Sequence, residues 1–268
     1  MLVCTVRGCA MPLVRKDQTL VCERGHSFDI ARAGYINLLQ PQDRRSKQPG
    51  DTAAAVRARE RLHDQGVTQP LLHAIEEMLA PLSTDTVLDA GCGDGFYLGS
   101  LARRAGFDAH GIDISTPAIQ AAAGRYPACE WIVANADRFV PYADRSFSIG
   151  LSITARMNAP EFRRVLRDDG KLLVAIPAPG DLIELRGIGR DRSERTIETF
   201  SNQFELAGRR RVTTAADLDA QSVQDLLLSI YRPMRAQPLT AMRVTFSLDL
   251  LLFHPHSTSR RSRIKEYP

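Results

Sequence analysis

The chain has 268 residues, of which 44% are hydrophobic and 25% charged, and its formal net charge is +4. This composition is typical of a soluble globular protein with one large domain, or with one domain and a small module. It excludes a membrane-spanning chain, because no apolar run approaches the ~20 residues needed to cross a bilayer.

The N-terminus opens a cysteine-rich segment and lacks the basic start and apolar core of a signal peptide. We therefore expect a cytoplasmic, reducing location, where clustered cysteines more often bind metal or do redox work than form disulfides. Three of the five cysteines lie in the first 22 positions. With one histidine they form two short pairs, Cys4-x4-Cys9 and Cys22-x3-His26.

The spacing of these pairs predicts a zinc site. Zinc takes four ligands in a tetrahedron, commonly two from each of two tight turns, and Gly8 and Gly25 permit such turns. Residues 12–14 and 19–22 resemble two short strands, a ribbon too small for its own core without a metal. A full set of four ligands leaves no position open to water, so the predicted zinc is structural. The alternative is three free cysteines and a surface histidine.

A polar connector follows the ribbon. Glycine, proline and charge mark residues 42–51 as an exposed loop. Residues 53–62 are rich in strong helix formers, and a second helix is expected at about 69–79. The predicted units are a zinc-binding ribbon at 1–40, a basic loop and helical connector at 41–84, and the main domain at 85–268.

The main domain begins with a strand, a glycine-rich turn and a helix. An apolar strand at 86–90 leads into Gly91, Gly93 and Gly95, and a second strand ends at Asp113, about twenty residues on. Such an acid is placed to accept hydrogen bonds from ribose hydroxyls. The alternative is a glycine turn that serves strand–helix packing alone. A nicotinamide-binding fingerprint has the spacing G-x-G-x-x-G, whereas these glycines alternate.

These segments resemble the class I S-adenosylmethionine-dependent methyltransferases. The resemblance is carried by motif I at 88–95 (LDAGCGDG), the second motif at 111–115, the third motif at 131–137, the fourth strand at 147–153, and a helix, turn and fifth strand at 162–174. Later strands at 205–212 and 244–253, with a helix at 223–232, complete the predicted fold. That fold is α/β, a Rossmann-like, mostly parallel seven-stranded sheet with a small N-terminal zinc ribbon.

The resemblance implies an S-adenosylmethionine site. Asp89 would lie near the methionine end of the cofactor, Asp113 would bind the ribose, and Asn135 and Ala136 would meet the adenine edge. The family usually has Asp at the Asn135 position. The implied cofactor-binding residues are Thr68, Asp89, Gly91, Gly93, Asp94, Gly95, Asp113, Asn135, Ala136 and Asp181.

A zinc ribbon ahead of this core resembles the 23S rRNA (guanine-N1)-methyltransferases, whose members include macrolide-resistance enzymes. The segments that carry this resemblance are 22–29, 34–39, 44–51, 177–185 and 233–235. The chain also departs from the family. Its first cysteine pair is Cys-x4-Cys where Cys-x2-Cys is common, Thr68 stands where relatives can carry Tyr, and Asp181 where they can carry His.

The resemblance implies methyl transfer to guanine N1 in a 23S rRNA hairpin. The enzyme mainly positions two reactants and excludes water, but N1 of neutral guanine carries a proton that must leave. From their positions, Arg156 would polarise O6 and Asp181 would accept the proton, although each alone is more typical of a surface residue. The target base must be unpaired or everted, because N1 lies on the Watson–Crick edge.

Basic runs indicate where RNA phosphates would bind. They are Arg44-Arg45-Ser46-Lys47, then Arg57, Arg59 and Arg61, then Arg209-Arg210-Arg211, and a C-terminal run at 260–265. Each run alone is more often a solvated face, whereas several beside one cleft would form a phosphate-binding track.

Two rival functions stay open from the sequence. The first is a methyltransferase of a small natural product, with the ribbon used for substrate binding or dimerisation. The second is an RNA-binding module without transfer activity, which the retained Asp89, glycines and Asp113 disfavour. We expect no membrane partner. The target guanine and the choice between monomer and homodimer are left undetermined.

Overall fold

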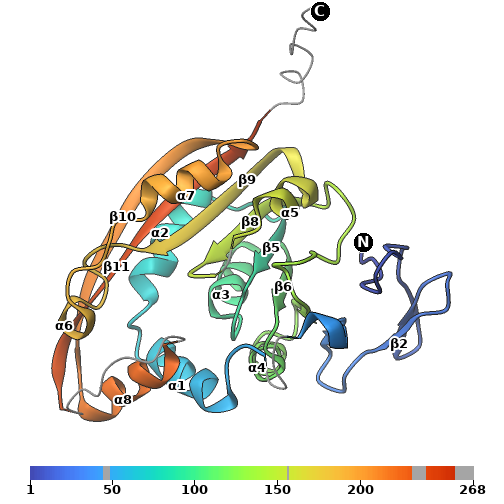
Figure 1. Cartoon of the computed structure of the whole chain (residues 1–268). Helices are drawn as coiled ribbons and strands as arrows, with labels where there is room; N and C mark the ends of the chain where they lie inside the picture. Colours follow the sequence, from blue (N-terminus) through green and yellow to red (C-terminus); the bar gives the residue numbers. More distant parts are fainter. Residues whose placement is uncertain (45–48, 156, 231–239, 257–268) are drawn as a thin grey trace, which may run out of the picture.

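The chain folds into one large sheet flanked by helices, with a small β-ribbon at its N-terminus (Figure 1). The computed structural model describes residues 1–44, 49–155, 157–230 and 240–256. The strands are β1 (Val14–Lys16), β2 (Thr19–Val21), β3 (Ser27–Asp29), β4 (Ile36–Asn37), β5 (Thr86–Ala90), β6 (Asp108–Asp113), β7 (Glu130–Val133), β8 (Phe147–Ile153), β9 (Leu166–Pro177), β10 (Phe204–Leu218) and β11 (Met242–Pro255). The helices are η1 (Pro41–Asp43), α1 (Ala53–Asp64), α2 (Gln69–Leu79), α3 (Phe96–Ala105), α4 (Thr116–Arg125), α5 (Ala159–Val165), α6 (Ile183–Arg186), α7 (Ser193–Phe200) and α8 (Ala220–Ser229).

The large sheet has eight strands in the order β10-β11-β9-β8-β5-β6-β7-β4. β5 pairs in parallel with both β6 and β8, so the chain reverses its direction of growth at β5. In such sheets ligands bind beyond the carboxyl ends of the strands at this switch point. The topology therefore places the glycine-rich turn after β5 where a cofactor site is expected.

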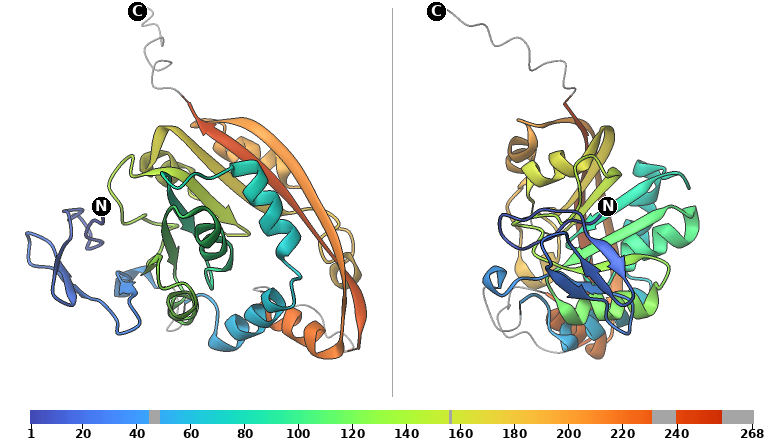
Figure 2. Two further views of the ribbon diagram at one scale, coloured as in Figure 1. Left: turned by 180° about the vertical axis from the view of Figure 1, so that it is seen from behind. Right: turned by 90° about the vertical axis from the view of Figure 1, so that its right-hand side faces the viewer.

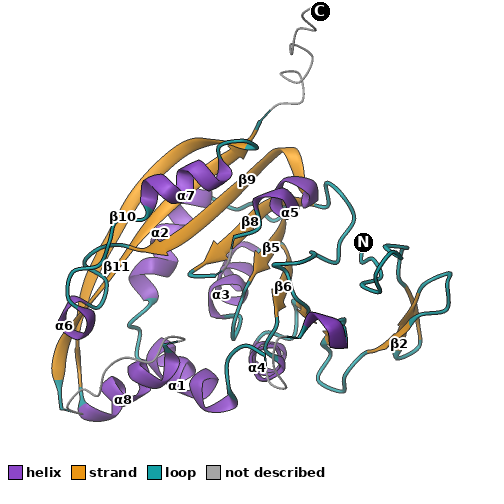
Figure 3. Cartoon of the chain, viewed as in Figure 1, coloured by secondary structure: helices purple, strands orange, loops and turns teal. Residues whose placement is uncertain are grey.

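Alternating side chains divide the interior into two cores. Leu88 and Ala90 pack in one cluster with α5, α7 and the ribbon, while Val87 packs in the other with α2, α3 and α4. Figure 3 shows the two sets of helices on opposite faces of the sheet. Burial on both faces explains why these strands read as continuous apolar runs in the sequence.

The ribbon is joined to the sheet by pairing as well as by the chain. β1, β2 and β3 form a three-stranded antiparallel sheet, and β4 then pairs in parallel with β7. Leu2 also bridges Tyr142, and the Thr5 hydroxyl donates to the Leu38 carbonyl at 2.6 Å. The seven predicted strands are therefore present, and β4 adds an eighth that is too short for its sequence to reveal. The three-part division of the chain stays a prediction.

The C-terminal strands form a hairpin longer than predicted. β10 and β11 run for 15 and 14 residues and pair from Phe204–Pro255 to Leu218–Met242, with a bulge near Gly208. Figure 2 shows this hairpin curving from the sheet to the end of the molecule that holds α1 and α8. There Leu218 and Val244 join Leu62 of α1 and Val223 of α8 in a third apolar cluster.

The two connector helices form where the sequence predicts them. α1 is N-capped by Thr52, whose hydroxyl accepts from the Ala55 amide. On α1, Arg61 forms two hydrogen bonds, at 2.6 and 2.7 Å, to the buried carboxylate of Asp225 on α8. The helix predicted at 223–232 begins earlier, at Ala220, and its last predicted residues lie outside the described part of the chain. None of the described helices combines the length and apolar character that a bilayer crossing requires.

Candidate active site and metal centre

Four ligand atoms converge in the N-terminal ribbon. His26 Nδ1 lies 3.4 Å from the sulfurs of both Cys4 and Cys22, and the Cys9 and Cys22 sulfurs are 3.8 Å apart. All four atoms lie within 4.8 Å of one another. A zinc tetrahedron with bonds of ~2.3 Å to sulfur and ~2.0 Å to nitrogen has edges of about 3.8 Å and 3.5 Å. The donor set therefore fits a closed, structural zinc site, as predicted.

Tight turns hold these ligands in place. Gly8 and Gly25 have φ of 71° and 80°, and the Gly25 amide donates to the Cys22 carbonyl. The pKa of the Cys22 thiol falls to about 7, because backbone N–H groups of His26 and Arg24 outweigh the burial that would raise it. The longer Cys-x4-Cys spacing is accommodated by a turn in which the Cys9 amide donates to Val6.

The glycine-rich turn after β5 is fixed by Asp113 at the end of β6. One Asp113 carboxylate oxygen accepts from the Gly93 amide at 3.0 Å, and the other accepts from the Ser115 amide at 2.8 Å. Gly91 and Gly95 have φ of 90° and 74°. A Cβ on Gly95 would lie 2.4 Å from the Trp131 ring, so no larger residue fits there. The turn therefore presents bare backbone, without side chains at its glycines, to an approaching ligand.

Asp89 on β5 is a buried acid with one unpaired carboxylate oxygen. Its side chain is 2% exposed, and Oδ1 has no hydrogen-bond partner. Burial raises the pKa of Asp89 to about 8, with a smaller contribution from the charge of Asp113. A buried carboxylate of this kind is stabilised by a cation, and S-adenosylmethionine carries an α-ammonium group. The predicted cofactor therefore fits the residues present.

Thr68 and Asp94 meet at His63, a histidine of α1 that belongs to no recognisable sequence motif. The Thr68 hydroxyl hydrogen-bonds His63 Nδ1 at 2.7 Å, and His63 Nε2 lies 3.5 Å from Asp94 Oδ2. The imidazole stacks on Phe96 with ring centroids 3.9 Å apart. Both predicted cofactor ligands therefore use their side chains to tie α1 and α2 to the glycine-rich turn. A single histidine within a helix offers no sequence signal for this arrangement.

Asn135 is joined to the connector. Its amide nitrogen donates to the Asp43 carbonyl at 3.1 Å, and the Asp43 carboxylate pairs with Arg138. The amide oxygen of Asn135 has no hydrogen-bond partner among the described residues, so an acceptor is left for the adenine amino group. The hydrogen bond that the Asn135 amide donates to the Asp43 carbonyl could not be made by the aspartate usual in the family, because an ionised carboxylate has no donor. Ala136, its neighbour, accepts from the Asn158 side chain through its carbonyl at 3.5 Å.

Of the two predicted catalytic residues, Arg156 lies outside the described part of the chain. Asp181 follows β9, at the same edge of the sheet as the glycine-rich turn. Its carboxylate accepts from the Ser247 amide at 3.0 Å and lies 3.7 Å from Arg186. Burial raises its pKa despite both contacts, which favours a role as proton acceptor.

Several predicted phosphate-binding arginines are used within the fold. Arg211 makes two hydrogen bonds at 2.8 Å to buried Asp249, and Arg209 pairs with Glu194 and Asp191. Arg210 pairs with Glu77, Arg59 with Asp51, and Arg61 with Asp225. The prediction that these arginines line a phosphate track is therefore not supported. Arg44 is exposed and has no ion-pair partner among the described residues.

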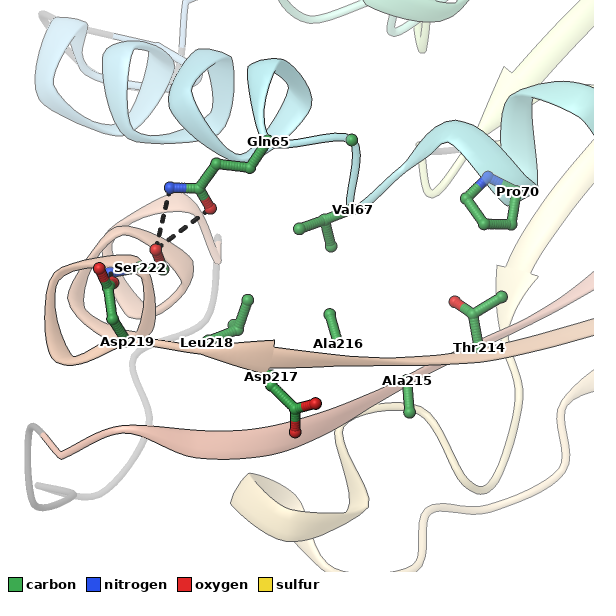
Figure 4. Close-up of a pocket in the computed structure, with 11 residues that line it drawn as sticks. Gln65, Val67, Pro70, Thr214, Ala215, Ala216, Asp217, Leu218, Asp219 and Ser222 are labelled. Carbon is green, nitrogen blue, oxygen red and sulfur yellow. Dashed lines mark hydrogen bonds between the residues drawn. The ribbon is translucent and has the colours of Figure 1, made fainter.

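Two surface cavities lie elsewhere. One, of about 400 Å³, lies between the α1–α2 junction and β10, where Val67, Ala216 and Leu218 face one another and Gln65 hydrogen-bonds Ser222 (Figure 4). The other, of about 530 Å³, lies in the ribbon beside His26 and Tyr35. The glycine-rich turn lines neither of them, so we assign no chemistry to these cavities.

Comparisons with known proteins agree with this architecture. Residues 4–47 match the zinc-ribbon family model described as "RlmA, N-terminal", and residues 87–174 match a methyltransferase domain model. The chain is 37% identical to the 23S rRNA (guanine(748)-N(1))-methyltransferase of Streptomyces fradiae, over 79% of this chain and 78% of that protein. It is 35% identical to a Bacillus subtilis relative provisionally named a 23S rRNA (guanine-N(1)-)-methyltransferase, with 78% and 79% covered.

Solved structures support the fold alone. A chain of the complex between the Haloferax volcanii Trm112 methyltransferase activator and a methyltransferase matches with a TM-score of 0.52 at 18% identity, covering 76% of this chain and 98% of that one. A structure concerned with conversion of a disulfide into a thioacetal in echinomycin biosynthesis matches with a TM-score of 0.51 at 17% identity, covering 71% and 84%.

The first prediction concerns the zinc. Purified protein should hold one zinc per chain, and Cys22→Ser should lose it because a tetrahedral site cannot close with three ligands. Cys129→Ser is the matched control, since Cys129 is a half-buried cysteine outside the cluster. Elemental analysis of the three proteins checks this, and stoichiometric zinc in Cys22→Ser would refute the ligand assignment.

The second prediction concerns Asp89. Its pKa near 8 means that the carboxyl is mostly protonated at pH 6, whereas a ligand α-ammonium binds the ionised form. Affinity for S-adenosylmethionine should therefore rise between pH 6 and pH 7, by up to about tenfold. Calorimetry at both pH values measures this, and Asp89→Asn should remove the pH dependence.

The same shift has a consequence for stability. The folded-state pKa of Asp89, about 8, lies above the ordinary aspartate value of 3.8, so its contribution to stability is complete below pH 3.8, falls as the pH rises and is lost once the pH passes 8. Cofactor-free Asp89→Asn should consequently melt above the wild type at pH 9, by at least about 2 °C. If the wild type and Asp89→Asn melted at the same temperature at pH 9 and bound S-adenosylmethionine with the same pH dependence, burial would not be raising the pKa of Asp89.

Proposed function

The chain belongs to the family of 23S rRNA (guanine-N1)-methyltransferases, and we propose that it methylates N1 of a guanine in a 23S rRNA hairpin. The observation that carries the proposal is the four-ligand cluster of the ribbon joined through β4 to the sheet that presents Asp89 and the glycine-rich turn. When bound, S-adenosylmethionine would supply a methyl group on a sulfonium centre. The thioether that leaves is neutral and needs no proton from the enzyme.

The residues of the chain would hold and orient the two reactants. Asp89 would face the methionine end, Asp113 the ribose and Asn135 the adenine, while the backbone of Gly91–Gly95 would lie against the cofactor. These contacts align the sulfonium with the incoming base, which is the main requirement of in-line transfer. A closed, water-poor site strengthens them.

Asp181 would receive the proton that leaves guanine N1. Its carboxylate lies at the carboxyl edge of the sheet, and burial raises its pKa, so that it takes a proton more readily than an exposed aspartate. The N1 lone pair forms the new N–C bond as the C–S bond breaks, and Asp181 holds the proton lost from N1. Arg156 is proposed to polarise O6 on the basis of its sequence position.

The basic loop is proposed to bind RNA phosphates beside this site. Its two ends are anchored there, because Asp43 accepts from Asn135 and the Asp51 carbonyl accepts from the Ser115 hydroxyl at 2.7 Å. The segment between these anchors contains Arg44, and also Arg45 and Lys47, which lie outside the described residues.

The third prediction tests the RNA substrate. Replacing Arg44, Arg45 and Lys47 with Gln should weaken binding of 23S rRNA fragments and flatten the salt dependence. Each lost phosphate contact removes about 0.7–0.9 from the log–log slope, so the change should be roughly two to three units. Fluorescence anisotropy from low to moderate salt measures the slope, and mass mapping of methylated guanines tests the product.

A matched control carries the same loss of charge elsewhere. Arg104, Arg145 and Arg167 lie near the amino ends of the parallel strands, at the edge opposite the glycine-rich turn. Their combined replacement with Gln should leave the slope unchanged. A slope that responds equally in both triple variants would show that net charge alone attracts the RNA. Faster methylation of a small molecule than of rRNA would overturn the proposed substrate.

A further inference from the structure

Arg59 of α1 reaches the glycine-rich turn with part of its guanidinium unused. Nη2 donates to Asp51 Oδ2 at 2.5 Å and to the Ser229 carbonyl at 3.2 Å. Nη1 has no hydrogen-bond partner among the described residues, and it lies 3.2 Å from the point that a Cβ on Gly93 would occupy. The free donor is therefore the one directed at the turn.

No hydrogen bond to a neighbouring acid uses this donor. Each Asp113 oxygen already accepts from an amide, Gly93 or Ser115, while Asp94 Oδ1 accepts from the Phe96 amide and Oδ2 lies 3.5 Å from His63 Nε2. The Arg59 side chain is 24% exposed, and a ligand carboxylate could use this donor in a charge-assisted hydrogen bond. Burial opposes its charge, but Asp51 and Asp94 hold the pKa of Arg59 above its usual value.

The amino-acid end of the cofactor is a zwitterion that this turn must accept. Asp89 and Asp113 lie beside the turn and Asp94 within it, and in their ionised forms they favour the α-ammonium but repel the α-carboxylate. A fixed cation is needed on the carboxylate side. Arginine is suited to it, because its planar fork can bind one carboxylate while a second acceptor holds its other edge.

We propose that Arg59 binds the α-carboxylate of the cofactor's methionine moiety, with Asp51 as the residue that positions its guanidinium. Together with Asp89, Arg59 then selects ligands that carry both charges of an α-amino acid. The inference rests on the proposed function only in requiring S-adenosylmethionine as the cofactor. It adds a binding residue from the connector, a part of the chain that precedes motif I.

The test compares two neutral thioethers that share the adenosine group. S-Adenosylhomocysteine has the amino-acid end, whereas 5′-methylthioadenosine lacks it. Arg59→Gln should weaken binding of S-adenosylhomocysteine by roughly 10–100-fold, the range expected for a charge-assisted hydrogen bond. Binding of 5′-methylthioadenosine should change by less than about twofold, within the scatter of such contributions. Titration calorimetry on the full-length protein measures both affinities.

Arg61→Gln is the matched control from the same helix. Arg61 bonds Asp225 on α8 and makes no contact with the glycine-rich turn, so its loss should lower the melting temperature and leave both affinities unchanged. Arg59→Lys keeps the charge without the fork and should recover part of the lost affinity.

Three results would overturn the proposal in distinguishable ways. Equal weakening of both ligands in Arg59→Gln would show that Arg59 supports the turn without binding the carboxylate. If Arg59→Gln fails to fold, the wild type alone can decide. Equal affinity of the wild type for S-adenosylhomocysteine and 5′-methylthioadenosine would show that the site does not select ligands with an amino-acid end. Absence of S-adenosylmethionine binding to the wild type would instead overturn the proposed function itself.

Discussion

Four carboxylates gather at the carboxyl edge of the parallel strands, and the surrounding structure is arranged to compensate them. Two amides hold Asp113, His63 lies beside Asp94, and Arg59 holds Asp51. Asp89 Oδ1 and Asp94 Oδ2 are buried and accept no hydrogen bond, and of the two only Asp94 has a basic side chain, His63, beside it. Neighbouring carboxylates in a buried site repel one another, so the site depends on α1 and the connector packing against the turn. The charge that these contacts leave uncompensated marks where a cation would bind.

The zinc ribbon extends this arrangement across the sheet. β4 leaves the ribbon as an edge strand beside β7, and the ribbon's buried cysteines share an apolar cluster with Leu88 and Tyr142. Zinc therefore stabilises a segment that is continuous with the catalytic core. The connector returns from the ribbon beside the proposed cofactor site, where the Asn135 and Ser115 side chains donate hydrogen bonds to it. A module that recognises RNA would in this way be held at a fixed position relative to the methyl donor.

The arginines show how a charge count can mislead. Arg209, Arg210 and Arg211 are adjacent in the sequence, and each pairs with an acid from another element, namely α7, α2 and the neighbouring strand β11. Arg61 likewise serves the α1–α8 contact. These pairs tie neighbouring elements of the fold together, and they leave the basic loop as the basic segment anchored beside the proposed site. The modest net charge is consistent with a short phosphate-binding segment.

Local patterns in the sequence determined the parts of the protein that depend on neighbouring residues. The spacing of Cys4, Cys9, Cys22 and His26 predicted the metal cluster, and the run from β5 to Asp113 predicted the strand, glycine-rich turn and helix, because tight turns and βαβ units are built from contiguous residues. Tertiary structure alone decided the rest. β4 is two residues long and exists through its pairing with β7, the hairpin gains its length from partners far along the chain, and His63 and Arg59 acquire their roles from acids at least eight residues away in sequence. Such contacts depend on how separate elements pack, and no local pattern records them.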